Sequence, residues 1–150
     1  MNVIKFNRDL RILQDKYDKR DRFGRVIKYG VDWTDTPQNR IIIVRNVEMP
    51  YPRTNLKTSN IKIMVPENIY DPAMGGGYYF YQNIFVDPEL KIWHEKKKQY
   101  VHIPRHYGAD RNGWSFLCIH PNGIVREEKN VLDFIRILQV YLKNVDPDSI

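Results

Sequence analysis

The chain has very little cysteine: Cys118 is the single one among 150 residues. One cysteine cannot form an internal disulfide framework, and cysteine-poor chains of this size are typical of reducing compartments. The first residues, MNVIKFNRDLRILQ, lack the uninterrupted apolar stretch of a secretory signal. No other segment is long and apolar enough to span a bilayer. We therefore expect a cytoplasmic protein with no membrane partner.

Two common kinds of ligand site are also missing from the sequence. The three successive glycines at 75–77 are not followed by Lys-Ser/Thr, so they do not indicate a phosphate-binding loop. The histidines at 94, 102, 106 and 120 show no paired metal-ligand spacing with Cys118, and we expect no metal site. No internal repeat or low-complexity linker divides the chain, whose length suits one domain spanning 1–150.

Positive charge, in contrast, is in excess and is concentrated near the N-terminus. The net charge is +6, and residues 1–28 hold nine basic against four acidic side chains, a surplus of five. Residues 2–21 show the three-and-four spacing of an amphipathic helix. Lys5, Arg8 and Lys19 fall on its polar face. That face is either a solvated helix surface or a docking surface for an acidic partner. The apolar face comprises Val3, Phe6, Leu10, Leu13 and Tyr17.

The middle of the chain shows the period-two pattern of strands. We predict strands over 25–33, 40–47, 60–65 and 84–86, of which the first three form an antiparallel meander because their links are short. Residues 66–83, rich in proline, glycine and tyrosine, predict a long loop packed by its own aromatics. Residues 89–112 are interpreted as mostly irregular, and 130–144 as a buried helix. This order is typical of an α+β fold.

Cys118 follows the apolar run WSFL, between the turn signals Asn112-Gly113 and Pro121-Asn122-Gly123. A thiol at the end of a short buried segment, beside irregular chain, suits a nucleophile that is both anchored and reachable. An ordinary buried cysteine, acting as a small core side chain, fits the same position. Both interpretations remain open at this point.

The order of elements and several motifs resemble the ubiquitin-conjugating enzyme superfamily, in particular its compact, divergent bacterial branch. Val65-Pro66, Tyr70-Asp71-Pro72 and residues 84–88 are similar to the Pro/Tyr-rich connection into the family's fourth strand. Asn112-Gly113 followed by Cys118-Ile119 is similar to its active-site segment. The resemblance implies an N-terminal helix, an antiparallel four-stranded meander, an active-site loop and a buried C-terminal helix.

The resemblance also implies an activity. Cys118 would accept a ubiquitin-like modifier as a thioester from an activating enzyme and pass it to an amine on a target protein. The activating enzyme would consume the ATP, so no cofactor is expected here. Members of the family carry a His-Pro-Asn segment before the cysteine, whereas here His120-Pro121-Asn122 follows it. His106 and His120 are the candidate bases, and Asn112 is either an oxyanion partner or a turn residue.

In this family the N-terminal helix is commonly part of the surface that docks on the activating enzyme, which implies docking roles for Lys5, Arg8, Arg11 and Lys19. One alternative is a non-catalytic interaction module with the same fold, in which Cys118 belongs to the core. A weaker alternative is a basic nucleic-acid-binding domain using residues 96–98 and 78–81; we do not expect nucleic acid among the partners. A cysteine hydrolase using Cys118 with His106 or His120 is the last alternative.

Overall fold

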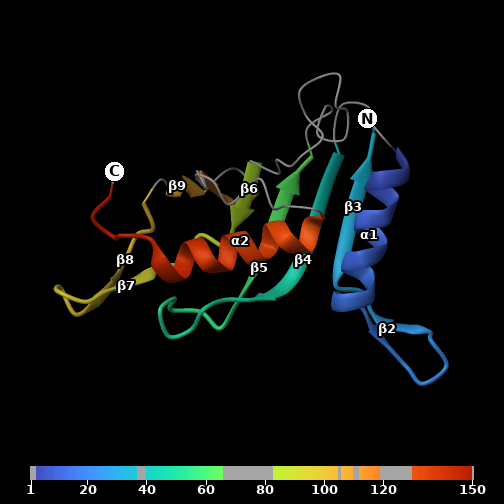
Figure 1. The fold of residues 1–150 in the computed structure, drawn as a ribbon, viewed down its shortest axis with the longest axis horizontal. Coiled ribbons are helices and arrows are strands. Elements are labelled where there is room, and N and C mark those ends of the chain that lie inside the picture. The colour runs from blue at the N-terminus through green and yellow to red at the C-terminus, as the bar shows by residue number, and fades with distance from the viewer. Residues whose placement is uncertain are drawn as a thin grey trace.

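The computed structural model describes residues 3–36, 40–65, 83–104, 106–109, 112–118 and 130–149. Within these ranges the chain forms two helices, α1 (Val3–Tyr17) and α2 (Val131–Asn144), together with ten strands. Six strands make one sheet and the other four make two separate hairpins. Figure 1 shows α2 lying across the strands of the sheet and α1 beside β3. The predicted α+β class is confirmed.

The main sheet is antiparallel throughout. Its strands, in spatial order, are β3 (Val31–Asp35), β4 (Arg40–Glu48), β5 (Thr58–Met64), β6 (Asn83–Val86), β10 (Ser115–Cys118) and β9 (His106–Ala109). The first four follow the chain order, so they form a meander, as predicted. The sheet is larger than the expected four strands because β10 pairs with β6 and then carries β9 on its other side.

Two hairpins lie outside this sheet. They pair β1 (Lys19–Arg20) with β2 (Val26–Lys28), and β7 (Ile92–His94) with β8 (Gln99–Val101). The prediction of one continuous strand over 25–33 is therefore wrong, since β2 and β3 belong to different sheets. The helix predicted over 2–21 ends at Tyr17, before β1. The irregular stretch predicted over 89–112 contains β7, β8 and β9, strands too short to show a periodic pattern. Positions 66–82 of the predicted loop over 66–83 lie outside the described residues, and Asn83 is the first residue of β6.

The hydrophobic core fills one face of the sheet. Two cross-strand rows of apolar side chains are buried there: Val31, Val44, Ile61 and Val86, and beside them Ile42, Ile63, Ile84 and Leu117. The helices cover these rows with the buried side chains Phe6, Leu10, Leu13, Val131, Phe134, Ile135, Leu138 and Leu142. Burying one such side chain contributes about 1.5–3 kcal/mol, so this layer dominates the stability of the fold.

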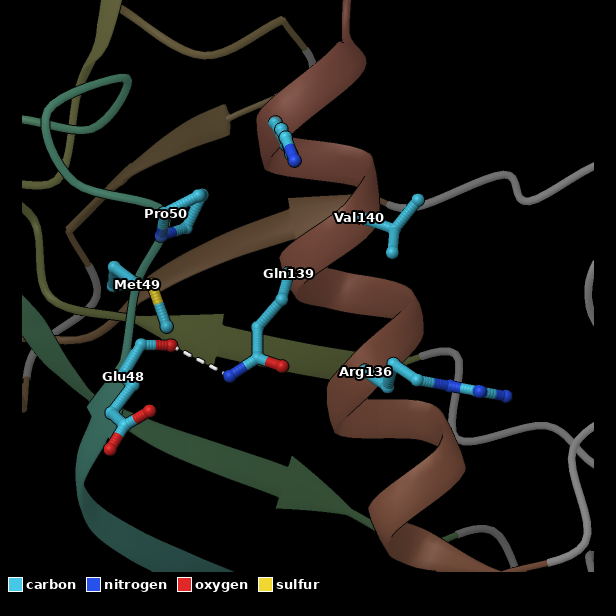
Figure 2. A pocket seen from close by; sticks show the side chains of 7 residues that line it. Glu48, Met49, Pro50, Arg136, Gln139 and Val140 are labelled. Atoms are coloured by element: carbon cyan, nitrogen blue, oxygen red, sulfur yellow. Dashed lines mark hydrogen bonds between the residues drawn. The ribbon is translucent and has the colours of Figure 1, made fainter.

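Helix α2 is fixed at its start and along its length by polar contacts. Asn130 caps it, with its Oδ1 accepting from the N–H groups of Leu132 and Asp133 while Asp133 accepts from the N–H of Asn130. Such a reciprocal cap satisfies donors that a helix end leaves unpaired. Farther along, Gln139 Nε2 donates to the carbonyl oxygen of Glu48 at 2.8 Å and joins α2 to the end of β4 (Figure 2).

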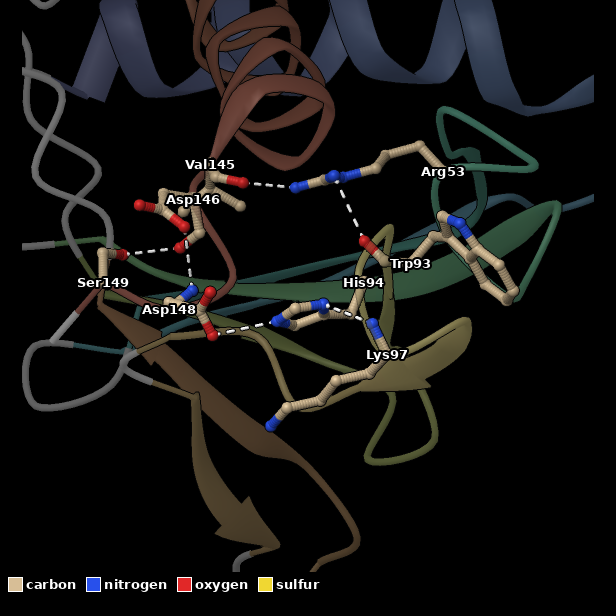
Figure 3. A network of polar contacts seen from close by, with 8 residues as sticks. All are labelled: Arg53, Trp93, His94, Lys97, Val145, Asp146, Asp148 and Ser149. Carbon is tan, nitrogen blue, oxygen red and sulfur yellow. Dashed lines mark hydrogen bonds and ion pairs between the residues drawn. The ribbon is translucent and has the colours of Figure 1, made fainter.

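One half-buried arginine holds the other end of α2. The Arg53 guanidinium donates to the carbonyl oxygens of Leu142 (3.3 Å) and Val145 at the helix C-terminus. It also donates to the carbonyl oxygen of Trp93 in β7, at 3.2 Å (Figure 3). A cation at this end of a helix satisfies unpaired carbonyls and complements the helix dipole. Arg53 therefore ties α2 to the β7–β8 hairpin.

The junction between α1 and β3 depends on a glycine. The N–H of Gly30 donates to Asp18 Oδ1 at 2.6 Å, in a buried contact. A Cβ atom at position 30 would lie 2.1 Å from the carbonyl oxygen of Tyr17. Only glycine permits this approach of two backbone segments, which sets the position of α1 against the edge of the sheet.

Two ion pairs bridge the edge strand β3 to β4. Arg45 Nη2 lies 2.7 Å from Asp32 Oδ2, and Arg40 Nε lies 2.9 Å from Asp35 Oδ1. All four side chains are at least partly exposed, so each pair contributes at most about 1 kcal/mol. Their effect is to place negative side chains on β3 opposite positive side chains on β4.

We predict that Gly30→Ala destabilises the protein by about 1–3 kcal/mol, because the new methyl group meets backbone that cannot move aside. Urea unfolding followed by circular dichroism measures the change. The matched control is Gly24→Asn: Gly24 has φ +82° with nothing within 4 Å of a Cβ, a conformation that asparagine tolerates. Equal stability of Gly30→Ala and the wild type would contradict the assigned contact.

Arg53→Met is expected to lower the free energy of unfolding by about 2–3 kcal/mol, since it leaves partly buried carbonyls unpaired. Thermal unfolding would show the loss. Arg136→Met serves as the comparison, because Arg136 is exposed and its nearest approach to Asp133 is 3.8 Å; we expect a change within about 0.5 kcal/mol there. Similar effects of the two substitutions would refute the anchoring role of Arg53.

Candidate functional site

Cys118 is the last residue of β10, where its backbone pairs with Asn83 in β6. The strand lies inside the sheet, between β6 and the edge strand β9. The preceding residues Ser115 and Leu117 are buried, so the run that leads to the cysteine is anchored in the core. The side chain of Cys118 itself lies outside the described residues.

His106, predicted as a candidate base, begins β9, and its backbone pairs with Leu117. It is therefore next to Cys118 along the ladder, although twelve residues separate the two in sequence. Adjacent strands lie roughly 5 Å apart, so the pairing makes these two backbones neighbours. The His106 side chain, and all of His120-Pro121-Asn122, lie outside the described residues.

Asn112 occupies a different place. It is exposed in the turn before β10, next to Gly113 with φ +81°. The three steps of β10 alone span about 10 Å, and Asn112 lies before the strand while Cys118 ends it. This position matches the turn role that the sequence left open for Asn112 and gives no support to the oxyanion role.

The four expected docking residues do not share one element. Arg8 and Arg11 are exposed on α1, and Lys5 belongs to the same helix by its backbone. Lys19 instead begins β1, beyond the helix. The sequence also did not indicate that Asp9, whose side chain is only 1% exposed, lies on the core side of α1, with Oδ1 3.8 Å from Arg8 Nη2.

His94 and Asp148 form a contact that the sequence did not indicate, because they lie 54 residues apart. Nε2 of the buried His94 is 2.9 Å from Asp148 Oδ1. Its Nδ1 accepts the backbone N–H of Lys97 at 3.1 Å (Figure 3). Nδ1 therefore carries no proton, and the imidazole is neutral with its proton on Nε2, facing the carboxylate.

This arrangement looks like the histidine–carboxylate pair of a catalytic base, but it cannot act as one in this geometry. The lone pair that would take up a proton, on Nδ1, already accepts from Lys97. The hydrogen bond from His94 is the main cause that lowers the pKa of Asp148 below its ordinary value, and the nearby Lys97 and Lys96 add to it. The pair therefore attaches the C-terminal segment to the β7–β8 turn.

A lysine is buried on the face of the sheet away from the two core rows. Lys62, in β5, is only 8% exposed although the alternating pattern NIKIMV suggests a solvent-facing side chain. Its Nζ lies 4.3 Å from the ring centre of Phe85 and 5.4 Å from that of Trp114. Aromatic faces stabilise a desolvated ammonium through the ring quadrupole, so these rings offset part of the cost of burial.

Two clefts open on the surface formed by the described residues. One, of about 260 Å³, lies between α2 and the end of β4 and is lined by Glu48, Met49, Arg136, Gln139, Val140 and Lys143 (Figure 2). The Gln139–Glu48 hydrogen bond crosses this cleft, and its charges are of both signs. The other, of about 360 Å³, lies at the base of the β1–β2 hairpin and is lined chiefly by lysines and tyrosines.

Across the described ranges, no group of three or more His, Cys, Asp or Glu side chains is arranged to hold a metal ion. Neither of the helices found there is long and apolar enough to cross a membrane. Comparison with protein-family models, with curated proteins and with solved structures finds no match for this chain.

The Asp148–His94 contact predicts a pH dependence of stability. Because the folded state lowers the pKa of Asp148, the contact stabilises the protein above the ordinary value of 3.8 and is lost as the pH falls below it. Melting temperatures of wild type and Asp148→Asn should therefore differ at neutral pH and converge below about pH 3.8. Asp15→Asn, at an exposed helix position, controls for general charge effects. A gap that persists unchanged at low pH would contradict this assignment.

Proposed function

We propose that this protein is a ubiquitin-conjugating-like enzyme that carries a ubiquitin-like modifier as a thioester on Cys118. The observation that carries the proposal is the place of Cys118 at the end of β10, directly after the β3–β6 meander in the sheet and ahead of α2. The buried neighbours Ser115 and Leu117 anchor the strand that carries Cys118. The order of helix, meander, cysteine and helix supports the same proposal.

The chemistry proceeds in two steps. The Cys118 thiolate attacks the thioester carbonyl on the activating enzyme; a new C–S bond forms, the old one breaks, and the activating enzyme's cysteine leaves as a thiolate. An amine of the target then attacks the Cys118 thioester, its nitrogen bonds to the carbonyl carbon, and Cys118 leaves as a thiolate. The amine's surplus proton passes to a base.

The backbone pairing of His106 beside the end of β10 supports His106 as that base over residues distant in the fold. His94 is unsuited, because both of its ring nitrogens already have hydrogen-bond partners. His120 remains a candidate base on the grounds given by the sequence. Thioester exchange between cysteines needs no such base, because one thiolate replaces another.

For docking on the activating enzyme, the exposed Arg8 and Arg11 of α1 support an acidic counterpart. Lys5 is proposed with them as a member of the same helix. Lys19 lies on the neighbouring hairpin and extends the positive surface beyond the helix end.

The decisive experiment incubates the protein with ATP, an activating enzyme and a ubiquitin-like protein from its own genomic neighbourhood, and reads the intact mass. We expect a mass gain equal to the modifier that dithiothreitol removes. Cys118→Ser is the informative variant, because a serine ester resists dithiothreitol and should accumulate. Cys118→Ala should show no adduct.

An adduct that forms equally on Cys118→Ala would contradict the proposal. A second contradiction would be a native thiol that iodoacetamide modifies only after unfolding, together with no adduct. Because Cys118 is the single cysteine, alkylation reports on this position alone. That second outcome would favour the non-catalytic interaction module, with Cys118 as a core residue.

A further inference from the structure

The cleft at the base of the β1–β2 hairpin collects positive charge. It measures about 360 Å³, and its lining includes Lys16, Lys19, Lys28 and Arg45. Asp32 neutralises Arg45 through the 2.7 Å ion pair, and the one carboxylate in the lining, Asp18, accepts the N–H of Gly30. Among the residues that the structure describes, none forms an ion pair with any of the three lysines.

The register of the hairpin sets two of these lysines against each other. Lys19 and Lys28 are direct cross-strand partners, and both are exposed. Like charges directly opposite in an antiparallel pair are destabilising. The fold therefore maintains a local repulsion at the mouth of the cleft, which a bound anion between the two ammonium groups would relieve.

Aromatic rings line the same place. Tyr17 and Tyr29 are part of the lining, and the Tyr29 side chain is 63% exposed. At the hairpin tip, Phe23 is 71% exposed with the Arg22 guanidinium 4.8 Å from its ring centre. Exposed aromatic faces interleaved with cations are typical of surfaces on which nucleic-acid bases stack while phosphates meet lysine and arginine.

The hairpin is built as a fixed projection. Asp21 Oδ1 accepts from the N–H groups of Phe23 (2.8 Å) and Arg25 (2.9 Å), and Arg20 Nη1 donates to the carbonyl oxygen of Gly24 (2.9 Å). At the base, the Gly30–Tyr17 contact locks the hairpin to α1. Figure 1 shows it extending past the end of β3. A preformed arm lowers the entropic cost of binding.

We propose that this cleft and hairpin bind single-stranded nucleic acid, with a phosphate held between Lys19 and Lys28 and a base stacked on Tyr29. Lys16 at the end of α1 lines the same cleft, and Arg22 and Arg25 lie on the hairpin, where they can contact neighbouring phosphates. An acidic peptide would use the lysines but leaves the exposed rings without a role, so the aromatic lining favours nucleic acid.

The site differs from the one considered from sequence. In the run at 96–98, Lys98 Nζ pairs with Glu95 at 2.6 Å, which neutralises part of that charge. Residues 78–81, the aromatic cluster, lie outside the described residues. The sequence indicates the surplus of basic residues over 1–28 but not the hairpin, because positions 19 and 28 become neighbours only through strand pairing.

The test measures fluorescence anisotropy of a labelled oligothymidylate or oligouridylate of about 15 nucleotides, titrated with the protein between about 50 and 200 mM salt. The double variant Lys19→Ala/Lys28→Ala should reduce the magnitude of the slope of log affinity against log salt by about 0.7, the value expected for loss of the one phosphate contact that the two lysines share. Tyr29→Ala should weaken binding about tenfold, and Tyr29→Phe should leave it unchanged.

Lys96→Ala/Lys97→Ala removes the same charge elsewhere and should leave affinity and slope nearly unchanged. Melting temperatures identify misfolding; the Lys19/Lys28 variant should match or exceed the wild type, because a repulsion is removed. Four results would overturn the proposal. Three are no binding at low salt, equal losses in both double variants, and competition by polyglutamate as strong as by oligonucleotide. The fourth is uridine monophosphate binding as tightly as the oligomer, which would assign the cleft to a free nucleotide.

Discussion

The burial of one face of the antiparallel sheet beneath two helices is the constraint on which the other features depend. Because the apolar rows run across β3, β4, β5, β6 and β10, each strand must keep its register to keep its side chain in the core. A slip by one residue would move every row to the other face. The register of β10, and so the pairing of the Cys118 backbone with Asn83, is thereby fixed.

Strand pairing also creates neighbours that the chain order hides. His106 meets the end of β10 only because β9 folds back on it. Lys19 meets Lys28 through the β1–β2 hairpin, and His94 meets Asp148 because the chain after α2 returns to the β7–β8 turn. Cys118 and His106, the residues of the proposed reaction, lie on different elements from the proposed nucleic-acid site. Lys19, which is also proposed to dock on the activating enzyme, is the residue that the two proposals share.

The elements that the sequence predicted correctly are those with a clear hydrophobic periodicity. The apolar face of α1 was confirmed at Phe6, Leu10 and Leu13, and the β-branched run in β4 and the alternation in β5 identified two strands of the meander. Three-residue strands such as β7 and β8 are shorter than a recognisable period. Their stabilisation comes from contacts made in the folded state.

Polar residues were predicted less well than apolar ones, for a related reason. Asp9 and Lys62 are both buried, contrary to what their polarity suggests. For Lys62 the burial depends on rings supplied by other segments, those of Phe85 and Trp114. Gly30 looks like an ordinary position in an alternating strand, yet the helix end 13 positions earlier leaves no room for a side chain there. Local sequence holds no trace of such long-range contacts.

The ion pairs along β3 have a consequence for solubility. A strand at the edge of a sheet presents unpaired backbone groups that can recruit a strand from another molecule and begin aggregation. Here Asp32 and Asp35 place negative charge along that edge, and each is held in position by an arginine from β4. A second copy that paired with this edge would have to remove water from these charged side chains, which disfavours the contact. The ion pairs contribute little to the free energy of folding, but they disfavour the pairing of this edge strand with a strand of another molecule.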